Sequence, residues 1–172
     1  MSDEALSAAL VGVAAELERR FSTRLSERAE FRGELTYRVA RNDWVEVLTF
    51  CRDSPQLAFD QLDCLVGDHL PERAEAPLEV AAHLTSHKHV LRLRIKTALA
   101  EGEALATATG LWLSAGFDER EIYEMLGVVF TDHPDLRRLL TTDDFEGHPL
   151  RKDFPLEGTV GGRIRTDLRG KI

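Results

Sequence analysis

The chain has 172 residues, of which 43% are hydrophobic and 30% charged, a balance typical of one globular domain with its own core. The formal net charge of −8 argues against a nucleic acid as the main partner, because nucleic-acid binding depends on basic surfaces. No apolar run approaches the ~20 residues that a membrane-spanning helix needs, and no basic-then-apolar leader opens the sequence, so we expect neither a direct membrane span nor a secretory signal.

The first predicted elements are a helix and a hairpin. Residues 5–20 carry apolar side chains at helical spacing, which predicts an amphipathic helix. Residues 24–31 and 34–39 are short runs on either side of Arg32-Gly33, and they predict a β-hairpin. The first of these runs has few apolar residues, so we expect it to be an edge strand.

A second helix is predicted over residues 43–52. Asn42 stands where its side chain can cap the helix, and Ser54-Pro55 ends it, because the residue before a proline disfavours helical geometry. After a short helix or loop, residues 60–65 predict a strand, and the polar stretch 67–77 predicts a loop.

Two further strands and a helix follow. Residues 78–85 and 91–96 alternate apolar and polar side chains, so we expect two strands with one face buried and the other in water. Residues 86–89 form the turn between them. The alanine-rich run 104–115 predicts a helix that stops at Gly116.

One more short helix is predicted from Asp118. Asp118 and Glu121 have the spacing of a capping box, and Gly127 suits the C-terminal end of the helix. The order of elements predicts an α+β fold in which helices pack in one layer on a mixed sheet of about five strands, with an extended C-terminal strap.

The stretch 117–156 is dense in charge and proline. Three prolines, at positions 134, 149 and 155, fix backbone angles and remove donors, although residues 135–140 predict another helical turn. We therefore divide the chain into an α+β docking domain, residues 1–129, and an extended strap and tail, residues 130–172. The segment 148–172 holds six Lys/Arg and three Asp/Glu, which suits docking on an acidic surface.

The same stretch carries a specific family signature. Its residues are Glu119-Arg120-Glu121, Glu124, Met125-Leu126-Gly127, His133-Pro134, Arg137-Arg138 and Leu139-Leu140, then Gly147-His148-Pro149-Leu150-Arg151-Lys152-Asp153-Phe154-Pro155. These two runs resemble the hallmarks of the 30 kDa subunit family of respiratory complex I. The weaker resemblance covers roughly residues 5–158. Phe117, Glu124 and Leu126 depart from the usual Trp, Asp and Phe of the family.

The resemblance implies a cofactor-free structural subunit in the peripheral arm of a proton-translocating NADH:quinone oxidoreductase, on the cytoplasmic side of the membrane. The chain would dock on the quinone-site (49 kDa-type) subunit and on the cluster-bearing subunits. Iron–sulfur clusters, FMN and quinone would reside on these partners, and catalysis would occur there. The residues expected at the contact between subunits are Glu119, Arg120, Glu121, Glu124, His133, Asp135, Arg137, Arg138, His148, Arg151, Lys152 and Asp153. Arg120 and Glu124 are one helical turn apart and can pair.

Two alternatives remain open. The closer one is the corresponding subunit of a membrane-bound hydrogenase or of another quinone-linked dehydrogenase related to complex I. The more distant one is a stand-alone metal-dependent enzyme that uses His133, His148 and the acidic run 143–146. We prefer a structural role in which the ring nitrogens of both histidines bond nearby backbone or carboxylate groups.

The remaining histidine and cysteine patterns are weak signals. His87-x-His89 at an exposed turn is more often solvated than metal-bound, because a third ligand is missing nearby. Cys51 and Cys64 are too few to hold an iron–sulfur cluster without other thiolates, and their apolar neighbours favour a buried structural role.

Overall fold

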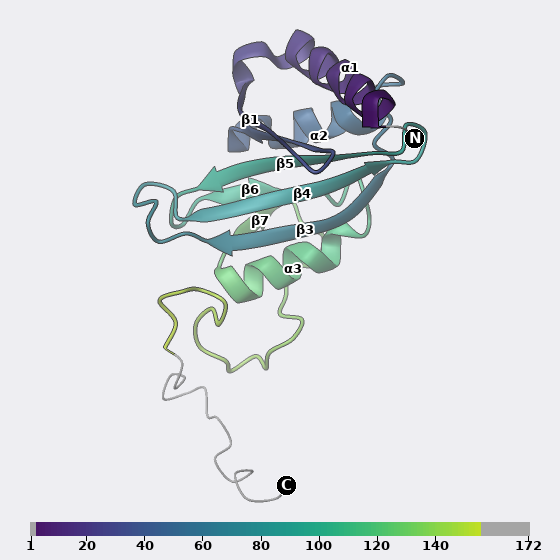
Figure 1. Cartoon of the computed structure of the whole chain (residues 1–172). Coiled ribbons are helices and arrows are strands. Elements are labelled where there is room, and N and C mark those ends of the chain that lie inside the picture. The colour runs from purple at the N-terminus through teal and green to yellow at the C-terminus, as the bar shows by residue number, and fades with distance from the viewer. Residues whose placement is uncertain (1–2, 156–172) are drawn as a thin grey trace, which may run out of the picture.

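A computed structural model describes residues 3–155, and the chain forms three α-helices and two sheets over this range (Figure 1). The helices are α1 (Asp3–Phe21), α2 (Trp44–Asp53) and α3 (Ala115–Leu126). The strands are β1 (Leu25–Phe31), β2 (Glu34–Val39), β3 (Gln61–His69), β4 (Leu78–Ser86), β5 (Leu91–Leu99), β6 (Ala104–Ala106) and β7 (Val129–Thr131). Within residues 3–155, no helix combines the length and apolar character that a bilayer crossing requires.

The main sheet has five strands in the order β1-β2-β5-β4-β3. Strands β2 and β5 are parallel, and the other three pairings are antiparallel. The predicted α+β fold with a mixed five-stranded sheet is therefore confirmed. The hairpin and its edge strand are also confirmed, since β1 pairs on one side with β2 and shows a register shift between Ser26 and Ala29.

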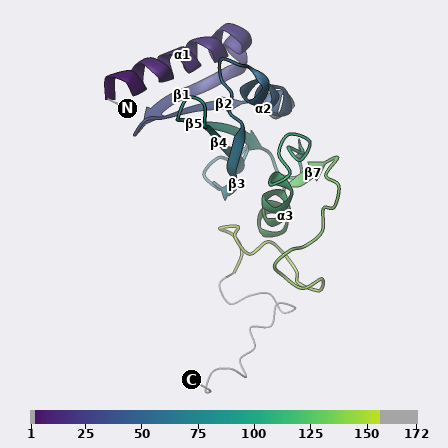
Figure 2. The ribbon, with the colours of Figure 1, turned by 90° about the vertical axis from the view of Figure 1, so that its right-hand side faces the viewer.

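One face of this sheet forms the core. The apolar side chains of β5, such as Leu93 and Ile95, are buried, whereas Arg92 and Lys96 point to the other face. Figure 2 shows α2 and α3 on the same side of the sheet, with α1 crossing over the end near β1. We call the opposite side, onto which Figure 1 looks, the open face of the sheet.

Strand β4 differs from its prediction, because it is buried on both sides. Glu79 on the open face is only 6% exposed, since the side chains of Arg38, Arg73 and Lys96 close over it and donate to its carboxylate at 2.6, 2.6 and 2.9 Å. Long basic side chains on neighbouring strands can bury a carboxylate in this way. The burial pattern of a central strand thus depends on neighbours that its own sequence does not show.

The helix predicted over 104–115 is wrong. Residues 104–106 form strand β6 and pair in parallel with β7, and a turn-rich segment leads from there to α3. Leu105 and Phe130 lie opposite each other in this second sheet and are both buried. Strand pairing with a distant segment overrides the local helix preference of the alanines here.

The predicted helix starts are also corrected. Asn42 does not cap α2: a short 3₁₀ turn precedes the helix, and no side chain caps it. Helix α3 begins at Ala115, three residues before the expected start, and Asp118 instead accepts a hydrogen bond from the backbone N–H of Leu65 at 2.7 Å. Asp118 thus ties α3 to the edge strand β3.

Candidate partner interface

The candidate site is the surface formed by α3 and the strap, the name we keep for residues 130–155. Strand β7 runs across the expected boundary at residues 129 and 130, and Phe130 is buried in the core. From Thr131 the chain leaves the core and crosses beneath α3 (Figures 1 and 2). Residues 135–140 form no helix. The part of the tail from residue 156 lies outside the described residues.

The strap caps the C-terminal end of α3. The last four carbonyl groups of a helix have no partner inside it. In α3 each one accepts a hydrogen bond from a later residue. The pairs, donor first, are Gly127 N to Tyr123 O (3.0 Å), His148 Nδ1 to Glu124 O (2.8 Å), Leu150 N to Met125 O (3.1 Å) and Arg151 Nη1 to Leu126 O (3.5 Å).

Arg120 and Glu124 bind the middle of the strap. The Arg120 guanidinium donates to the carbonyl oxygens of Arg137 and Arg138, both at 3.0 Å. The Glu124 carboxylate accepts from the backbone N–H groups of residues 139–141. The two side chains do not pair with each other, so that expectation is wrong.

The environment of Glu124 favours its charged form. Its burial alone would raise the pKa of this carboxyl, but the Thr141 hydroxyl and the three backbone N–H groups lower the pKa to about 2. A carboxylate that accepts several backbone N–H groups behaves in this manner. Glu124 is therefore ionised at neutral pH although it is 1% exposed.

Glu119 and His133 hold the start of the strap. Glu119 is fully buried and accepts from the hydroxyl of Thr107 at 2.5 Å and the N–H of Ala108 at 2.6 Å, and this burial raises its pKa. His133 accepts the backbone N–H of Asp135 at Nδ1, so its Nε2 carries the proton and donates to the carbonyl of Gly116 at 3.1 Å. The predicted structural role of both His-Pro histidines is confirmed by these bonds and by the bond of His148.

The end of the strap is anchored by two residues that the sequence did not indicate. His69, buried at the end of β3, accepts the backbone N–H of Lys152 at 2.9 Å. Glu101 accepts two hydrogen bonds from the Arg151 guanidinium, which also binds Asp153 at 3.3 Å. A buried histidine at a strand end is a weak sequence signal, because its partner is 83 residues away.

The remaining expected contact residues point outward. Arg137 is 75% exposed and pairs only with Asp135 within the part of the chain that the structure describes, and Arg138 donates to the Thr141 hydroxyl. Glu121, Lys152 and Asp153 are exposed. The twelve expected contact residues therefore divide into a set that shapes the strap and a set that is open to a partner.

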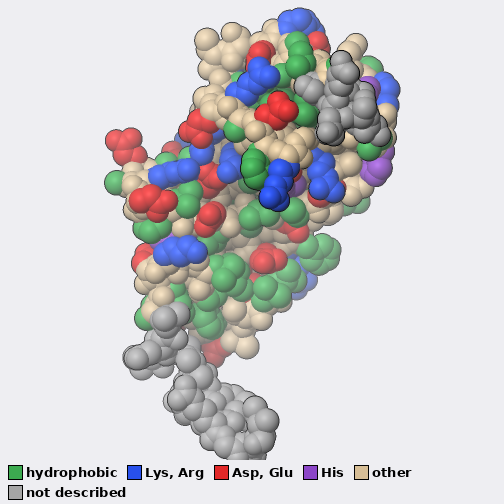
Figure 3. All heavy atoms as spheres, in the orientation of Figure 1, with side chains coloured by type: hydrophobic (Ala, Val, Ile, Leu, Met, Phe, Trp, Pro, Cys, Tyr) green, Lys and Arg blue, Asp and Glu red, His purple; other side chains and the backbone are tan. Residues whose placement is uncertain are grey.

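Exposed apolar side chains accompany the outward set. Phe117 and Leu140 are each 63% exposed, Leu150 is 57% exposed, and Leu113 just before α3 is 90% exposed. Figure 3 shows hydrophobic side chains gathered in the lower half of the molecule, where α3 and the strap lie. Apolar patches rimmed by polar groups are typical of protein interfaces.

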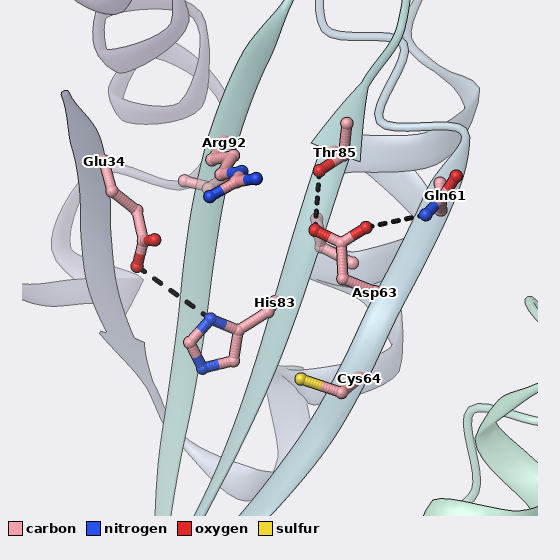
Figure 4. A pocket seen from close by; sticks show the side chains of 9 residues that line it. Glu34, Gln61, Asp63, Cys64, His83, Thr85 and Arg92 are labelled. Atoms are coloured by element: carbon pink, nitrogen blue, oxygen red, sulfur yellow. Dashed lines mark hydrogen bonds and ion pairs between the residues drawn. The ribbon is translucent and has the colours of Figure 1, made fainter.

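A polar hollow of about 450 Å³ lies on the open face of the sheet (Figure 4). Asp63 at its far end is bound by Gln61 and by Thr85, at 2.8 and 2.6 Å. His83 has a lowered pKa, because burial and then the charge of Arg94 disfavour its protonated form. Among residues 3–155, no group of three or more His, Cys, Asp or Glu side chains is arranged to hold a metal ion.

Both cysteines are free thiols. Cys51 is fully buried in the core, and its burial raises the pKa of the thiol. Cys64 is half-buried at the rim of the polar hollow, and burial raises its pKa first, followed by the charges of Asp118 and Asp63. A raised thiol pKa disfavours the reactive thiolate.

Comparison with known proteins identifies the family. Residues 37–160 match the family described as "Respiratory-chain NADH dehydrogenase, 30 Kd subunit". One subunit of the NADH-quinone oxidoreductase of Paramagnetospirillum magneticum is 48% identical over 137 residues, which are 80% of this chain and 68% of that protein. The protein of the same name from Azorhizobium caulinodans is 42% identical, over 80% of this chain and 64% of its own length. The chain thus spans about two thirds of the length of these relatives.

Two solved structures share the fold. A structure described as "Nqo5 of the trypsin-resistant fragment (1-134) in P63 form" has a TM-score of 0.63 and 25% identity, and the match covers 74% of this chain and 99% of that chain. A chain of a "membrane-bound sulfane sulfur reductase (MBS), an archaeal respiratory membrane complex" has a TM-score of 0.71 and 18% identity, over 84% of each chain. The second likeness concerns the fold alone. By its match over residues 37–160 and its identity to these relatives, the chain belongs to the family of the 30 kDa subunit of the respiratory-chain NADH dehydrogenase.

Proposed function

We propose that this chain is a cofactor-free structural subunit of the peripheral arm of a proton-translocating NADH:quinone oxidoreductase. It docks on the quinone-site subunit and the cluster-bearing subunits, on the cytoplasmic side of the membrane. Clusters, FMN and quinone belong to those partners, and this chain contributes to catalysis by fixing their geometry. The names of its relatives and the family match support this assignment.

One observation carries the proposal. The charged and histidine side chains of the family signature bind the chain's own backbone, and they hold the strap in a defined shape on α3. That shape leaves Phe117, Leu140 and Leu150 exposed on one side of the molecule. A strap that is fixed before docking loses less conformational freedom on binding, which favours a stable contact.

The docking surface divides the signature residues by role. Arg137 and Lys152 reach solvent and are the side chains that we assign to the partner contact. Arg120, Glu124 and His148 act through the strap, because their polar atoms are already bound within the chain. Outward apolar side chains supply the buried centre of such an interface, and the charges form its rim.

The test is purification of the tagged chain from its native membranes in mild detergent, with mass spectrometry of what accompanies it. We expect quinone-site and iron–sulfur subunits together with an NADH-oxidising module. Substituting Leu140→Asp and Leu150→Asp together reduces their recovery by about tenfold or more, since a charge is placed in a desolvated contact. The matched control is Val11→Asp, which alters a similarly exposed apolar residue on α1.

Three results contradict the proposal. Recovery of the wild-type chain alone in the soluble fraction means that the surface has no such partner. Recovery with the large subunit of a nickel hydrogenase assigns the chain to the related membrane-bound hydrogenases instead. Equal recovery of the double variant and the control places the contact on another surface.

A further inference from the structure

A second hollow lies on the open face of the sheet, beside the hairpin of β1 and β2. It has a volume of about 260 Å³, and we call it the arginine hollow. Its lining residues are Phe31, Arg32, Gly33, Glu34, Thr36, Arg92 and Arg94. Three guanidinium groups and one carboxylate therefore surround it, in a chain whose overall charge is −8.

Two of the three arginines have no carboxylate partner among the described residues. The Glu34 carboxylate is bound by Arg94. Arg92 lies beside Glu34 on the neighbouring strand but is exposed, and the ion pairs within residues 3–155 do not include it. Arg32 is exposed at the hairpin tip and stacks 5.1 Å from the centre of the Phe31 ring.

The fold forces these charges together. Parallel pairing of β2 with β5 sets Glu34 against Arg92 and Thr36 against Arg94. Like charges on adjacent positions of a sheet repel one another, and a bound anion relieves this repulsion. The lowered pKa of His83, caused by burial and then by Arg94, is a second sign of the positive potential here.

The surroundings of the hollow favour a peptide segment over a small ion. The arginine hollow shares Glu34 and Arg92 with the larger polar hollow shown in Figure 4. That hollow continues across β5 and β4 to Gln61 and Asp63 on β3. Phe31 is 72% exposed at the other end and offers an apolar contact. An extended chain can thus cross the open face, with its acidic end at the arginines.

We propose that the arginine hollow binds a carboxylate-bearing segment of a partner subunit, which lies across the open face of the sheet. Asp or Glu side chains of the segment accept forked hydrogen bonds from Arg32 and Arg92, and Phe31 packs against its backbone. This contact is separate from the α3–strap surface, and it rests on the proposed function in that the chain works within a complex. Nucleic acid fits poorly, because three arginines beside Asp63 offer far fewer phosphate contacts than the roughly 6–10 of a typical site.

The direct test uses Arg92→Lys, which keeps the charge and introduces a primary amine. The complex carrying this variant is treated with a carbodiimide, which joins an amine to a carboxylate in contact with it. We expect a cross-link between position 92 and an Asp or Glu of another subunit, identified by mass spectrometry of the peptides. A cross-link to Glu34 alone, or no cross-link, overturns the proposal.

A charge reversal provides the second readout. The double substitution Arg32→Glu and Arg92→Glu is expected to lower recovery of the partner about tenfold at low salt, because repulsion replaces attraction at the contact. Arg41→Glu is the matched control, an exposed arginine outside the hollow. The melting temperatures of both variants confirm that each one folds. Unchanged recovery of the double variant overturns the proposal.

The outcomes separate this proposal from the proposed function. If the wild-type chain recovers the subunits of the oxidoreductase and the charge reversal recovers them equally well, only the arginine hollow fails. If the wild-type chain is recovered alone, both fail. Nucleic acid that accompanies the wild-type chain and is lost with the charge reversal overturns the assignment to an acidic protein segment.

Discussion

Arg120 and Glu124 lie one turn apart on α3 and bind consecutive stretches of the same strap backbone, Arg120 as a donor and Glu124 as an acceptor. Together they satisfy two carbonyls and three N–H groups of a segment that makes no regular structure of its own. Buried backbone groups need such partners. The strap is therefore shaped by α3 rather than by its own sequence pattern.

Replacing Glu124 with Gln should loosen the strap. The amide keeps one acceptor oxygen and turns a donor toward backbone N–H groups, so we expect a loss of about 2–3 kcal/mol in the free energy of unfolding. Hydrogen exchange of the amides of residues 139–141 should accelerate more than that of the sheet. Glu121→Gln, at an exposed position on the same helix, is the control, and equal exchange in both variants contradicts this account.

The same carboxylate predicts an acid dependence in the wild-type chain. The folded pKa of Glu124 is about 2, below its ordinary value of 4.5. Its contribution to stability is thus present above 4.5 and is lost as the pH falls toward 2. Strap amides should lose protection in this window in the wild type, whereas the Gln variant should show no further loss there.

Gly127 is the position at which α3 must end. Its φ is +85°, and an added Cβ would lie 2.7 Å from Nε2 of His148. Gly127→Ala therefore faces both a left-handed backbone, which costs about 1–2 kcal/mol, and a clash with the strap. We expect a lower melting temperature and faster exchange of residues 148–151. His148→Ala removes the clash and should recover part of the loss when combined with it, and strict additivity would contradict this coupling.

The sequence was sufficient for most of the fold. Helical spacing in α1 and α2, alternation in β5 and the glycine at 127 each depend on neighbours within a few residues, so their patterns are local. Strand β6 could not be predicted from its alanines, because its pairing with β7 joins segments about 25 residues apart. The burial of Glu79 depends likewise on arginines from β2 and the loop before β4.

The candidate site was predictable as a segment but not as a set of roles. The family signature located the strap, and the charge of its residues suggested a contact with another subunit. Distances alone separate Arg120, which binds the chain's own carbonyls, from Arg137, which faces solvent. Asp118 and His69 were missed as anchors, because their partners lie 53 and 83 residues away in the chain.

Glu119 should make stability fall as the pH rises. Burial raises its pKa above the ordinary value of 4.5, so the folded state holds its proton more tightly than the unfolded chain. Its contribution is fully present below 4.5 and is lost as the pH rises through the raised pKa. Glu119→Gln keeps an acceptor for the N–H of Ala108 and can donate to Thr107, yet it does not ionise.

The measurement is urea unfolding of the wild type and Glu119→Gln across a series of pH values above 4.5. We expect the difference in the free energy of unfolding to move in favour of Gln as the pH increases. Glu119→Ala, which leaves the N–H of Ala108 without its acceptor, should be less stable than both at every pH, by about 2 kcal/mol or more. Parallel curves for the wild type and Gln would contradict the raised pKa.

Gly67 sets the distance between β3 and α3. A Cβ at this position would clash with Cδ1 of Leu126 and lie 3.0 Å from Cγ2 of Ile122. Gly67→Ala should therefore push α3 away from the sheet edge and carry the strap with it, at a loss of about 1–3 kcal/mol. Leu126→Ala alone should lose about 2–4 kcal/mol through the cavity it leaves. Because the new methyl group fills part of that cavity, the double variant should be more stable than the sum of the two losses predicts, and a double-mutant cycle by urea unfolding measures this coupling. If α3 were free to shift without cost, the losses would simply add, and the position of the strap would not depend on Gly67.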